Sequence, residues 1–443
     1  MPYSRGVRGR LPILGHVAPM VRRGRDAVRH PISRNAIALG SIQLATFLLP
    51  LITIPYLSRV LGPSSFGALV LSQSLSFLLL VIVDYGFATW GAREAATRRN
   101  SPEELTDLMR SIMSAKVLLV AVAAIVAGIA VVALPLARED PLLALMAWIA
   151  ASAQGVQPMW LLIGIEDVRF VATLQLVTRA SITALTFVVV QDSGDVRWAM
   201  GLFTLAAVAP AVATLILAAK HVSYRGPRLR LGLGPIRAAW HMFIGVGAFN
   251  LYTTANVTLL GFFATSAQVG NFGAAERIIR AGSGLMLPVA AASLPRLAFL
   301  LSEGRRDRAL QLLGLLTAAM AIIGGIGSTL LVLLAEPITH LIYGAEYPQA
   351  AEVLRILGPI VLLVAVSNAC GAGWLLANNL DRQIVRIALA AAAVNIVLAA
   401  VLAPAHGPVG MAVAVLTAEV VVMIGCAWAI FRHERLVATP VPS

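Results

Sequence analysis

The chain has 443 residues, of which 59% are hydrophobic and 12% are charged, and its mean hydropathy is +0.84. Soluble domains carry about 25% charged residues, so this composition excludes an ordinary soluble protein and predicts a polytopic membrane protein. The formal charge of +13 would indicate nucleic-acid binding in a soluble protein. In a membrane protein it fits Lys and Arg gathered in the cytoplasmic loops, so we expect no nucleic-acid partner. Cys370 and Cys426 lie in apolar stretches, where no disulfide is needed.

About twelve apolar stretches are long enough to cross a hydrocarbon core as helices, which predicts an all-α fold. Residues 1–31, before the first stretch, are basic and are expected to form a cytoplasmic tail. The predicted spans cover residues 36–57, 66–91, 112–136, 141–163, 170–190, 197–219, 240–264, 271–297, 310–334, 349–376, 384–403 and 408–431.

Positive charge divides the connections between these spans into two classes. Lys and Arg fill the N-terminal tail and every second connection, whereas the connections on the other side carry Arg59, Arg138 and Arg197. Because Lys and Arg concentrate in cytoplasmic loops, this bias predicts that both termini are cytoplasmic.

Two halves of the chain share local patterns. Trp160-Leu161-Leu162 closes the fourth span of the first half, and Trp374-Leu375-Leu376 closes the fourth span of the second. These matches predict two pseudo-symmetric lobes of six helices each, a parallel repeat whose interface is a common place for a transport path. The expected parts are a tail at 1–31, an N-lobe at 32–220, a cytoplasmic linker at 221–239, a C-lobe at 240–435 and a tail at 436–443.

Motifs of enzymes and cofactor sites are missing from the sequence. It contains no HExxH, no CxxC and no Walker A lysine, and its exterior loops are too short for a catalytic domain. We therefore expect neither an enzyme nor a bound metal or cofactor.

Basic side chains inside the predicted spans are the first candidates for a site. A charge there costs at least about 2.5 kcal/mol and usually faces the bundle interior or a wet cavity. Arg179 is expected near mid-bilayer on a polar helical face with Gln175, and Arg277 and Arg280 share a face of their span. Since arginine suits phosphate oxygens, these residues predict an anion-binding cavity, with internal salt bridges and snorkelling as the alternatives. The candidates are Arg179, Arg277, Arg280, Arg355, Lys116, Asn250 and Gln175.

A second set of ionisable residues suits gating or coupling. Glu276 can pair with Arg280 at i, i+4. Glu419 is a lone carboxylate near mid-span that could carry a proton or hydrogen-bond a neighbouring helix. Asp84 and the Arg93–Glu94 pair could form either a cytoplasmic gate or a structural clasp. The full set is Arg59, Asp84, Arg93, Glu94, Glu276 and Glu419.

Five segments carry a family resemblance. They are PLITIPYLSRVLGPSSFG at Pro50–Gly67, DYGFATWGAREAA at Asp84–Ala96, WLLIGIE at Trp160–Glu166, VGNFGAAERI at Val269–Ile278 and AEPITHLIYGAEYPQAAEVLRIL at Ala335–Leu357. Through them the chain, over about residues 32–430, resembles the polysaccharide-export branch of the multidrug/oligosaccharidyl-lipid/polysaccharide (MOP) exporter superfamily, the O-antigen flippase type.

The resemblance implies a bacterial inner-membrane flippase for surface polysaccharide biosynthesis. Such a protein moves undecaprenyl-diphosphate-linked oligosaccharides to the periplasmic leaflet by alternating access. The resemblance further implies that a basic cavity between the lobes holds the diphosphate. Coupling to H⁺ or Na⁺ and contact with polymerase or export proteins are suspected.

Three other functions stay open at this point. A lipid II flippase would be favoured by fourteen spans. A cation-coupled multidrug antiporter of the same superfamily would be expected to use acidic cavity residues, whereas the buried groups here lean basic. A membrane-embedded polymerase or ligase would be expected to carry a large periplasmic loop.

Overall fold

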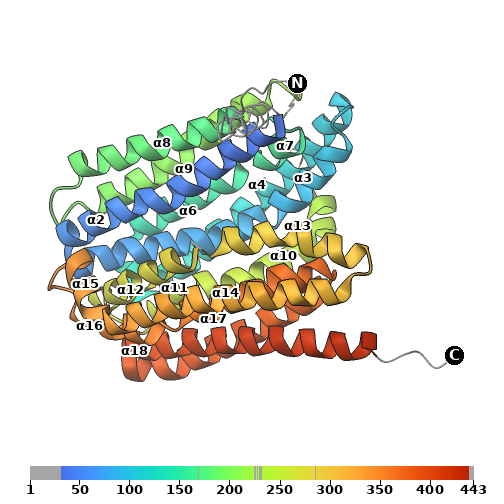
Figure 1. Ribbon diagram of the computed structural model, residues 1–443. Coiled ribbons are helices and arrows are strands. Elements are labelled where there is room, and N and C mark those ends of the chain that lie inside the picture. Colours follow the sequence, from blue (N-terminus) through green and yellow to red (C-terminus); the bar gives the residue numbers. More distant parts are fainter. Residues whose placement is uncertain are drawn as a thin grey trace, which may run out of the picture.

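The computed structural model describes residues 31–167, 169–223, 226, 228, 232–284 and 286–438, and within them the chain forms helices and no strands (Figure 1). Seven of the described helices are long and apolar enough to cross a membrane. Large apolar side chains such as Ile125, Val132 and Leu315 point outward, each at least 60% exposed, which suits contact with lipid tails. The predicted all-α polytopic class is confirmed. Each predicted span falls on helical segments, while the number of crossings stays a prediction.

The first half of the chain forms eight labelled helices. α2 reverses direction at Gly62, whose φ of 70° is the left-handed conformation that glycine adopts without steric cost. α4 and α6 begin at prolines, after Ser101 and Asp140, whose side chains cap the first turns of those helices. The bounds are α2 Pro31–Asp84, α3 Phe87–Thr97, α4 Pro102–Ala133, α5 Pro135–Glu139, α6 Pro141–Val156, α7 Met159–Gly164, α8 Arg169–Val189 and α9 Val196–Ala218.

The second half repeats much of this order. Short α15 follows long α14 as α5 follows α4, and Trp374 in η2 is fully buried like Trp160 in α7. α18 reverses at Gly407 as α2 does at Gly62. The bounds are α10 Leu233–Thr254, α11 Asn256–Leu260, α12 Ser266–Gly284, α13 Leu287–Ser302, α14 Arg306–Leu333, α15 Ala335–Tyr343, α16 Pro348–Leu357, α17 Ile360–Asn368, η2 Ala369–Leu375 and α18 Asp381–Ala438.

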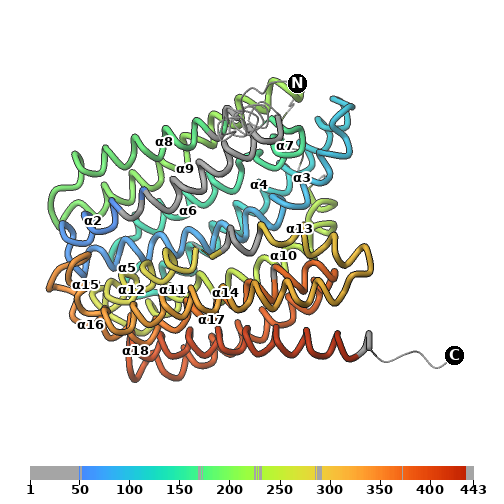
Figure 2. Tube along the Cα trace, in the orientation of Figure 1, coloured from blue at the N-terminus to red at the C-terminus, as the bar shows by residue number. Residues whose placement is uncertain are grey.

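The helices run between two ends of the molecule (Figure 2). We call the end at which α2 begins and α18 finishes the termini end. The opposite end, with the reversals at Gly62 and Gly407 and the short helices α5 and α15, is the hairpin end. The sequence predicts that the termini end is cytoplasmic.

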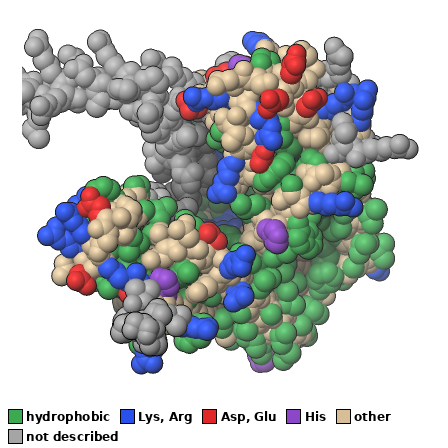
Figure 3. All heavy atoms as spheres, turned by 90° about the vertical axis from the view of Figure 1, so that its right-hand side faces the viewer, with side chains coloured by type: hydrophobic (Ala, Val, Ile, Leu, Met, Phe, Trp, Pro, Cys, Tyr) green, Lys and Arg blue, Asp and Glu red, His purple; other side chains and the backbone are tan. Residues whose placement is uncertain are grey.

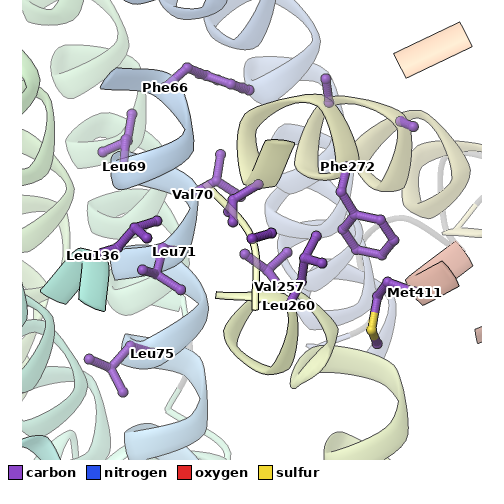
Figure 4. Close-up of a cluster of buried hydrophobic side chains, with 14 of the residues drawn as sticks. Phe66, Leu69, Val70, Leu71, Leu75, Leu136, Val257, Leu260, Phe272 and Met411 are labelled. Atoms are coloured by element: carbon purple, nitrogen blue, oxygen red, sulfur yellow. The ribbon is translucent and has the colours of Figure 1, made fainter. Parts of the chain in front are cut away.

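The hydrophobic core joins the two halves at the hairpin end. One continuous cluster of buried side chains runs from α2, α5 and α6 into α11, α12, α16 and α18. In Figure 4, Val70 of α2 lies beside Val257 and Leu260, while Leu136 of α5 packs on the other side of α2. Burial of this apolar surface holds the halves together here.

The core divides at the termini end. There one cluster around Trp160 belongs to the first half together with the start of α10, and a separate one around Trp374 belongs to the second half. Figure 3 looks onto this end and shows a hollow between two groups of side chains, with basic side chains around it. The hydrophobic core is therefore continuous between the halves at the hairpin end. At the termini end it is divided, and in this sense the termini end is parted, although the start of α10 packs on the first half there, with the Phe243 ring stacked on Tyr85 at 4.3 Å.

Candidate functional site

The halves meet most closely where α2 crosses α12. A Cβ atom on Gly67 would lie 1.8 Å from the carbonyl oxygen of Ser266, and one on Gly270 would lie 2.2 Å from that of Pro63. No side chain larger than hydrogen fits such a backbone approach. The glycines thus allow the two helices to touch backbone to backbone, as small residues do in membrane helix pairs.

An aromatic cluster seals the crossing on its hairpin side. Phe66 has no exposed surface and packs against Tyr343 and Tyr347, with ring centroids 6.4 and 6.0 Å away. The Tyr347 hydroxyl donates to the backbone carbonyl of Ser58 at 2.8 Å, which ties the second half to the first. The backbone of α15–α16 is therefore fixed against α2 by both rings and a hydrogen bond.

Arg277 of α12 reaches into this contact. Its guanidinium donates a hydrogen bond to Oε1 of Gln73 on α2 and lies 5.0 Å from the centroid of the Phe66 ring. Both partners belong to the first half, so Arg277 links the halves directly. In the described residues no carboxylate forms an ion pair with it, since the nearby Glu276 pairs with Arg280.

Arg280 lies one turn further along α12, toward the termini end. Its side chain is 45% exposed and binds Glu276 at 3.1 Å and the carbonyl oxygen of Thr253 at 3.0 Å. The predicted i, i+4 pair of Glu276 with Arg280 is present. Arg277 and Arg280 thus form one basic face, with Arg277 inside the contact between the halves and Arg280 beside it.

Glu276 also belongs to a buried polar network in the second half. Asn256 donates to its carboxylate at 3.4 Å, and Asn395 of α18 donates to Asn256 at 2.7 Å. Glu419 is buried on the second leg of α18, with 8% exposure. Whether Glu276 or Glu419 couples transport to an ion stays a prediction.

Arg179 and Gln175 lie together on α8, as their spacing predicts. Both side chains are half-buried, and Gln175 contacts the sulfur of Met159 at 3.9 Å. α8 packs against α2 and α9, so this polar face lies within the first half. Arg179 and Arg277 therefore lie on different helices, α8 and α12, and in different halves of the chain.

Lys116 lies among packed helices of the first half. Its side chain is 1% exposed, and its ammonium donates to the carbonyl oxygen of Gly155 and lies 3.9 Å from the Asp84 carboxylate. The Phe87 ring lies 5.8 Å from the same ammonium. This placement favours the structural clasp among the alternatives for Asp84.

Four other predicted residues are placed apart from Arg277. Arg355 is exposed on α16 and pairs with Glu336 of α15 at 3.1 Å, and exposed Arg59 donates to the carbonyl oxygen of Leu341. Asn250 donates to the carbonyl oxygen of Val246 within α10, at 2.8 Å. Arg93 is exposed.

Glu94 forms an ion pair with Arg98 and not with its expected partner, Arg93. Arg98 lies one helical turn away as the C-cap of α3, and this is the pairing that i, i+4 spacing favours. Glu94 and Arg98 line a cavity of about 590 Å³ with Trp90 and residues of α4 and α10 at the termini end.

Sequence reasoning missed the partners of Arg277. Gln73, Tyr343 and Tyr347 were not selected as site residues. A single glutamine in an apolar span gives no local signal, and both tyrosines lie in the connection between the predicted spans 310–334 and 349–376. Phe66 and both tyrosines do lie in segments that carry the family resemblance, which was the available hint.

Comparison with known proteins agrees with this architecture. A family model described as "Polysaccharide biosynthesis protein" matches residues 32–300, more than half of the chain. A protein of Escherichia coli (strain K12) named "Putative O-antigen transporter" is 28% identical over 395 residues, which cover 88% of this chain and 94% of the relative.

Two solved structures share the fold. The lipid II flippase MurJ in an inward closed conformation matches with a TM-score of 0.66 at 13% identity, over 90% of this chain and 87% of that one. An inward-facing MATE family multidrug transporter of the MOP superfamily matches with a TM-score of 0.63 at 14% identity, over 90% and 99%.

Proposed function

The chain belongs to the polysaccharide biosynthesis protein family, and we propose that it is a flippase for undecaprenyl-diphosphate-linked oligosaccharide repeat units. It would move them across the bacterial inner membrane by alternating access, for assembly of O-antigen, capsule or exopolysaccharide. The support comes from the relative named as an O-antigen transporter and from the shared fold of a lipid II flippase.

One observation carries the proposal: among the described residues the hydrophobic core is continuous between the halves at one end and divided at the other, and a basic face lies within the contact. Arg277 and Arg280 stand on this face, between the closed hairpin end and the parted termini end. A diphosphate entering between the halves would meet guanidinium groups that suit phosphate oxygens, while the polyprenyl tail stayed in lipid. We assign the helices of residues 32–220 and 240–435 to the two moving lobes, joined by the linker at 221–239.

In this proposal the termini end faces the cytoplasm, as the distribution of Lys and Arg predicts, and the state described here accepts substrate from that side. The hairpin end would open to the periplasm. Polymerase and export proteins would receive the glycan there.

Deletion of the gene tests the function, with polyprenyl-linked glycans extracted and analysed afterwards. We expect a complete lipid-linked repeat unit to accumulate and surface polysaccharide to be lost. A normal glycan profile with new drug sensitivity would instead support a multidrug antiporter, and accumulation of lipid II would support a peptidoglycan-precursor flippase.

Arg179 offers a test at residue level. We expect Arg179→Ala to abolish export while the protein stays abundant and inserted, because a half-buried polar face on α8 would lose its charge. Arg179→Lys should keep some export if charge suffices, and little if a bidentate phosphate grip is needed. Surface polysaccharide in a complemented deletion strain is the readout.

The control for this test is Arg99→Ala. Arg99 is exposed and forms a surface ion pair with Glu166 at 3.3 Å, which contributes about 0–1 kcal/mol. Export by Arg179→Ala at the level of Arg99→Ala would remove Arg179 from the anion path.

A further inference from the structure

One of the bonds across the hairpin-end contact is a bond that an anion can compete for. Arg277 donates to the neutral amide oxygen of Gln73 and stands over the neutral ring of Phe66. A guanidinium forms stronger hydrogen bonds with phosphate or carboxylate oxygens than with neutral acceptors, and it can hold two phosphate oxygens at once. In the described residues no carboxylate lies within ion-pair distance of Arg277, so an anion that reached it would have no salt bridge to displace.

The same bond is one of the links between the two halves. Gln73 and Phe66 lie on α2, Arg277 lies on α12, and between them the helices cross at Gly67 and Gly270. Phe66 also supports the rings of Tyr343 and Tyr347. If Arg277 released Gln73 and Phe66, the contact between α2 and α12 would therefore be weaker at one side of the crossing.

We propose that Arg277 is a diphosphate-sensitive latch, which releases Gln73 and Phe66 when a diphosphate binds it and thereby favours opening of the hairpin end. A ligand shifts a conformational equilibrium only by its differential affinity for the two states. One N–H group of Arg277 is bonded to Gln73 in the closed state and would be released in the open state, so a diphosphate that uses this donor binds the open state more tightly. The latch rests on the proposed function and adds how substrate binding is linked to opening.

Arg280 gives the latch a direction. It is exposed one turn closer to the termini end, and its charge is partly satisfied by Glu276. A diphosphate arriving from the parted end would meet Arg280 first and Arg277 second. The order of the two arginines along α12 thus leads the anion toward the latch.

The experiment measures the distance across the hairpin end. Spin labels are attached at Ser193→Cys and Ala345→Cys, both exposed positions, and electron double resonance measures the distance between them. The full-length protein carries Cys370→Ser and Cys426→Ser, so that the labels react only at these sites, and it is held in lipid nanodiscs. The probes are inorganic pyrophosphate and, in a second arm, a short-chain polyprenyl diphosphate. The second arm separates a free diphosphate from a lipid-bound one as the source of the anion.

The parent protein is the spin-labelled protein without further substitutions. We expect either probe to raise the fraction of its molecules that show the longer 193–345 distance by about tenfold, the factor that one charged hydrogen bond implies. Gln73→Ala should raise it similarly without a probe, since the latch has lost its acceptor. Arg277→Gln should lose the response to the probe, and Arg277→Lys should keep part of it.

Arg305→Gln is the matched control, because Arg305 is an arginine of the same half that is no candidate for the site and whose exposed side chain pairs with Glu303. It should respond as the parent does. An unchanged distance in the parent with both probes overturns the latch, and so does a parent-like response of Arg277→Gln. If Arg277→Gln does not fold, an unchanged distance in Gln73→Ala without a probe overturns it instead.

The latch and the flippase function fail in different ways. Absence of a lipid-linked glycan after gene deletion would refute the flippase but would leave a pyrophosphate response of Arg277 intact. Accumulation of the glycan, together with a parent-like Arg277→Gln, would refute the latch alone.

Discussion

Gly67→Ala is expected to reduce export at least fivefold. Its new methyl group would lie 1.8 Å from the carbonyl oxygen of Ser266 and 2.8 Å from the amide nitrogen of Gly270, and both are backbone atoms that cannot rotate away. Overpacking of this kind costs about 1–3 kcal/mol, which biases a two-state equilibrium by about 5- to 150-fold. The halves could then no longer close at the hairpin end. Surface polysaccharide and the spin-label distance between residues 193 and 345 are the readouts.

Gly325→Ala is the matched control for this variant. Gly325 also lies within a helix, α14, but a Cβ atom there meets no other atom within 4 Å. Alanine is the better helix former, so this change should be neutral or slightly stabilising. Normal export and an unchanged hairpin-end distance in Gly67→Ala would show that the α2–α12 crossing accommodates a methyl group, and normal export with an increased distance would show that closure there is not required.

The general architecture was predictable from composition and the lengths of apolar stretches. A bilayer leaves helices as one of few structures that satisfy every backbone hydrogen bond. The described helices confirm the all-α polytopic class. The segments around Pro50–Gly67 and Val269–Ile278 also indicated a polysaccharide-export protein, and the family match confirms membership of a polysaccharide biosynthesis family. Both reversals, at Gly62 and Gly407, fell between predicted spans.

The pairing of individual charges was predictable only within one helix. Spacing along a helix gave the Glu276–Arg280 pair, because i, i+4 neighbours touch in any helix. The contact of Arg277 with Gln73 spans 204 residues of sequence, and only the packing of α2 on α12 brings the two together. Periodicity carries no information on such a contact.

Depth in a span was likewise a poor guide to surroundings. Arg355 and Lys116 were both expected to face an anion cavity, yet one is exposed beside Glu336 and the other is enclosed by helices. Which side of a helix faces the other half depends on its rotation about its own axis, which neighbouring helices set. Function at either residue stays a prediction that mutation can test.

Lys116→Met is expected to destabilise the first half by about 3 kcal/mol. The change removes the only ion-pair partner of Asp84 among the described residues and the donor to the Gly155 carbonyl, so a carboxylate and a carbonyl lose their partner together. Breaking a buried pair from one side costs about 3–5 kcal/mol, and the 26% exposure of Asp84 favours the low end. Heat unfolding in detergent measures the loss, with exposed Lys220→Met as the control.

The double variant Lys116→Met/Asp84→Asn separates a clasp from a substrate contact. It removes both charges, and replacement of a buried ion pair by neutral groups is often far less costly than removal of one partner. If Lys116 is a clasp, the double variant should be more stable than Lys116→Met and should regain export. If the double variant is likewise more stable than Lys116→Met yet exports nothing, the Lys116 charge acts on the substrate or on a gate. The clasp interpretation then fails. Because stability and export are measured on the same variants, a folding defect cannot be mistaken for a loss of transport.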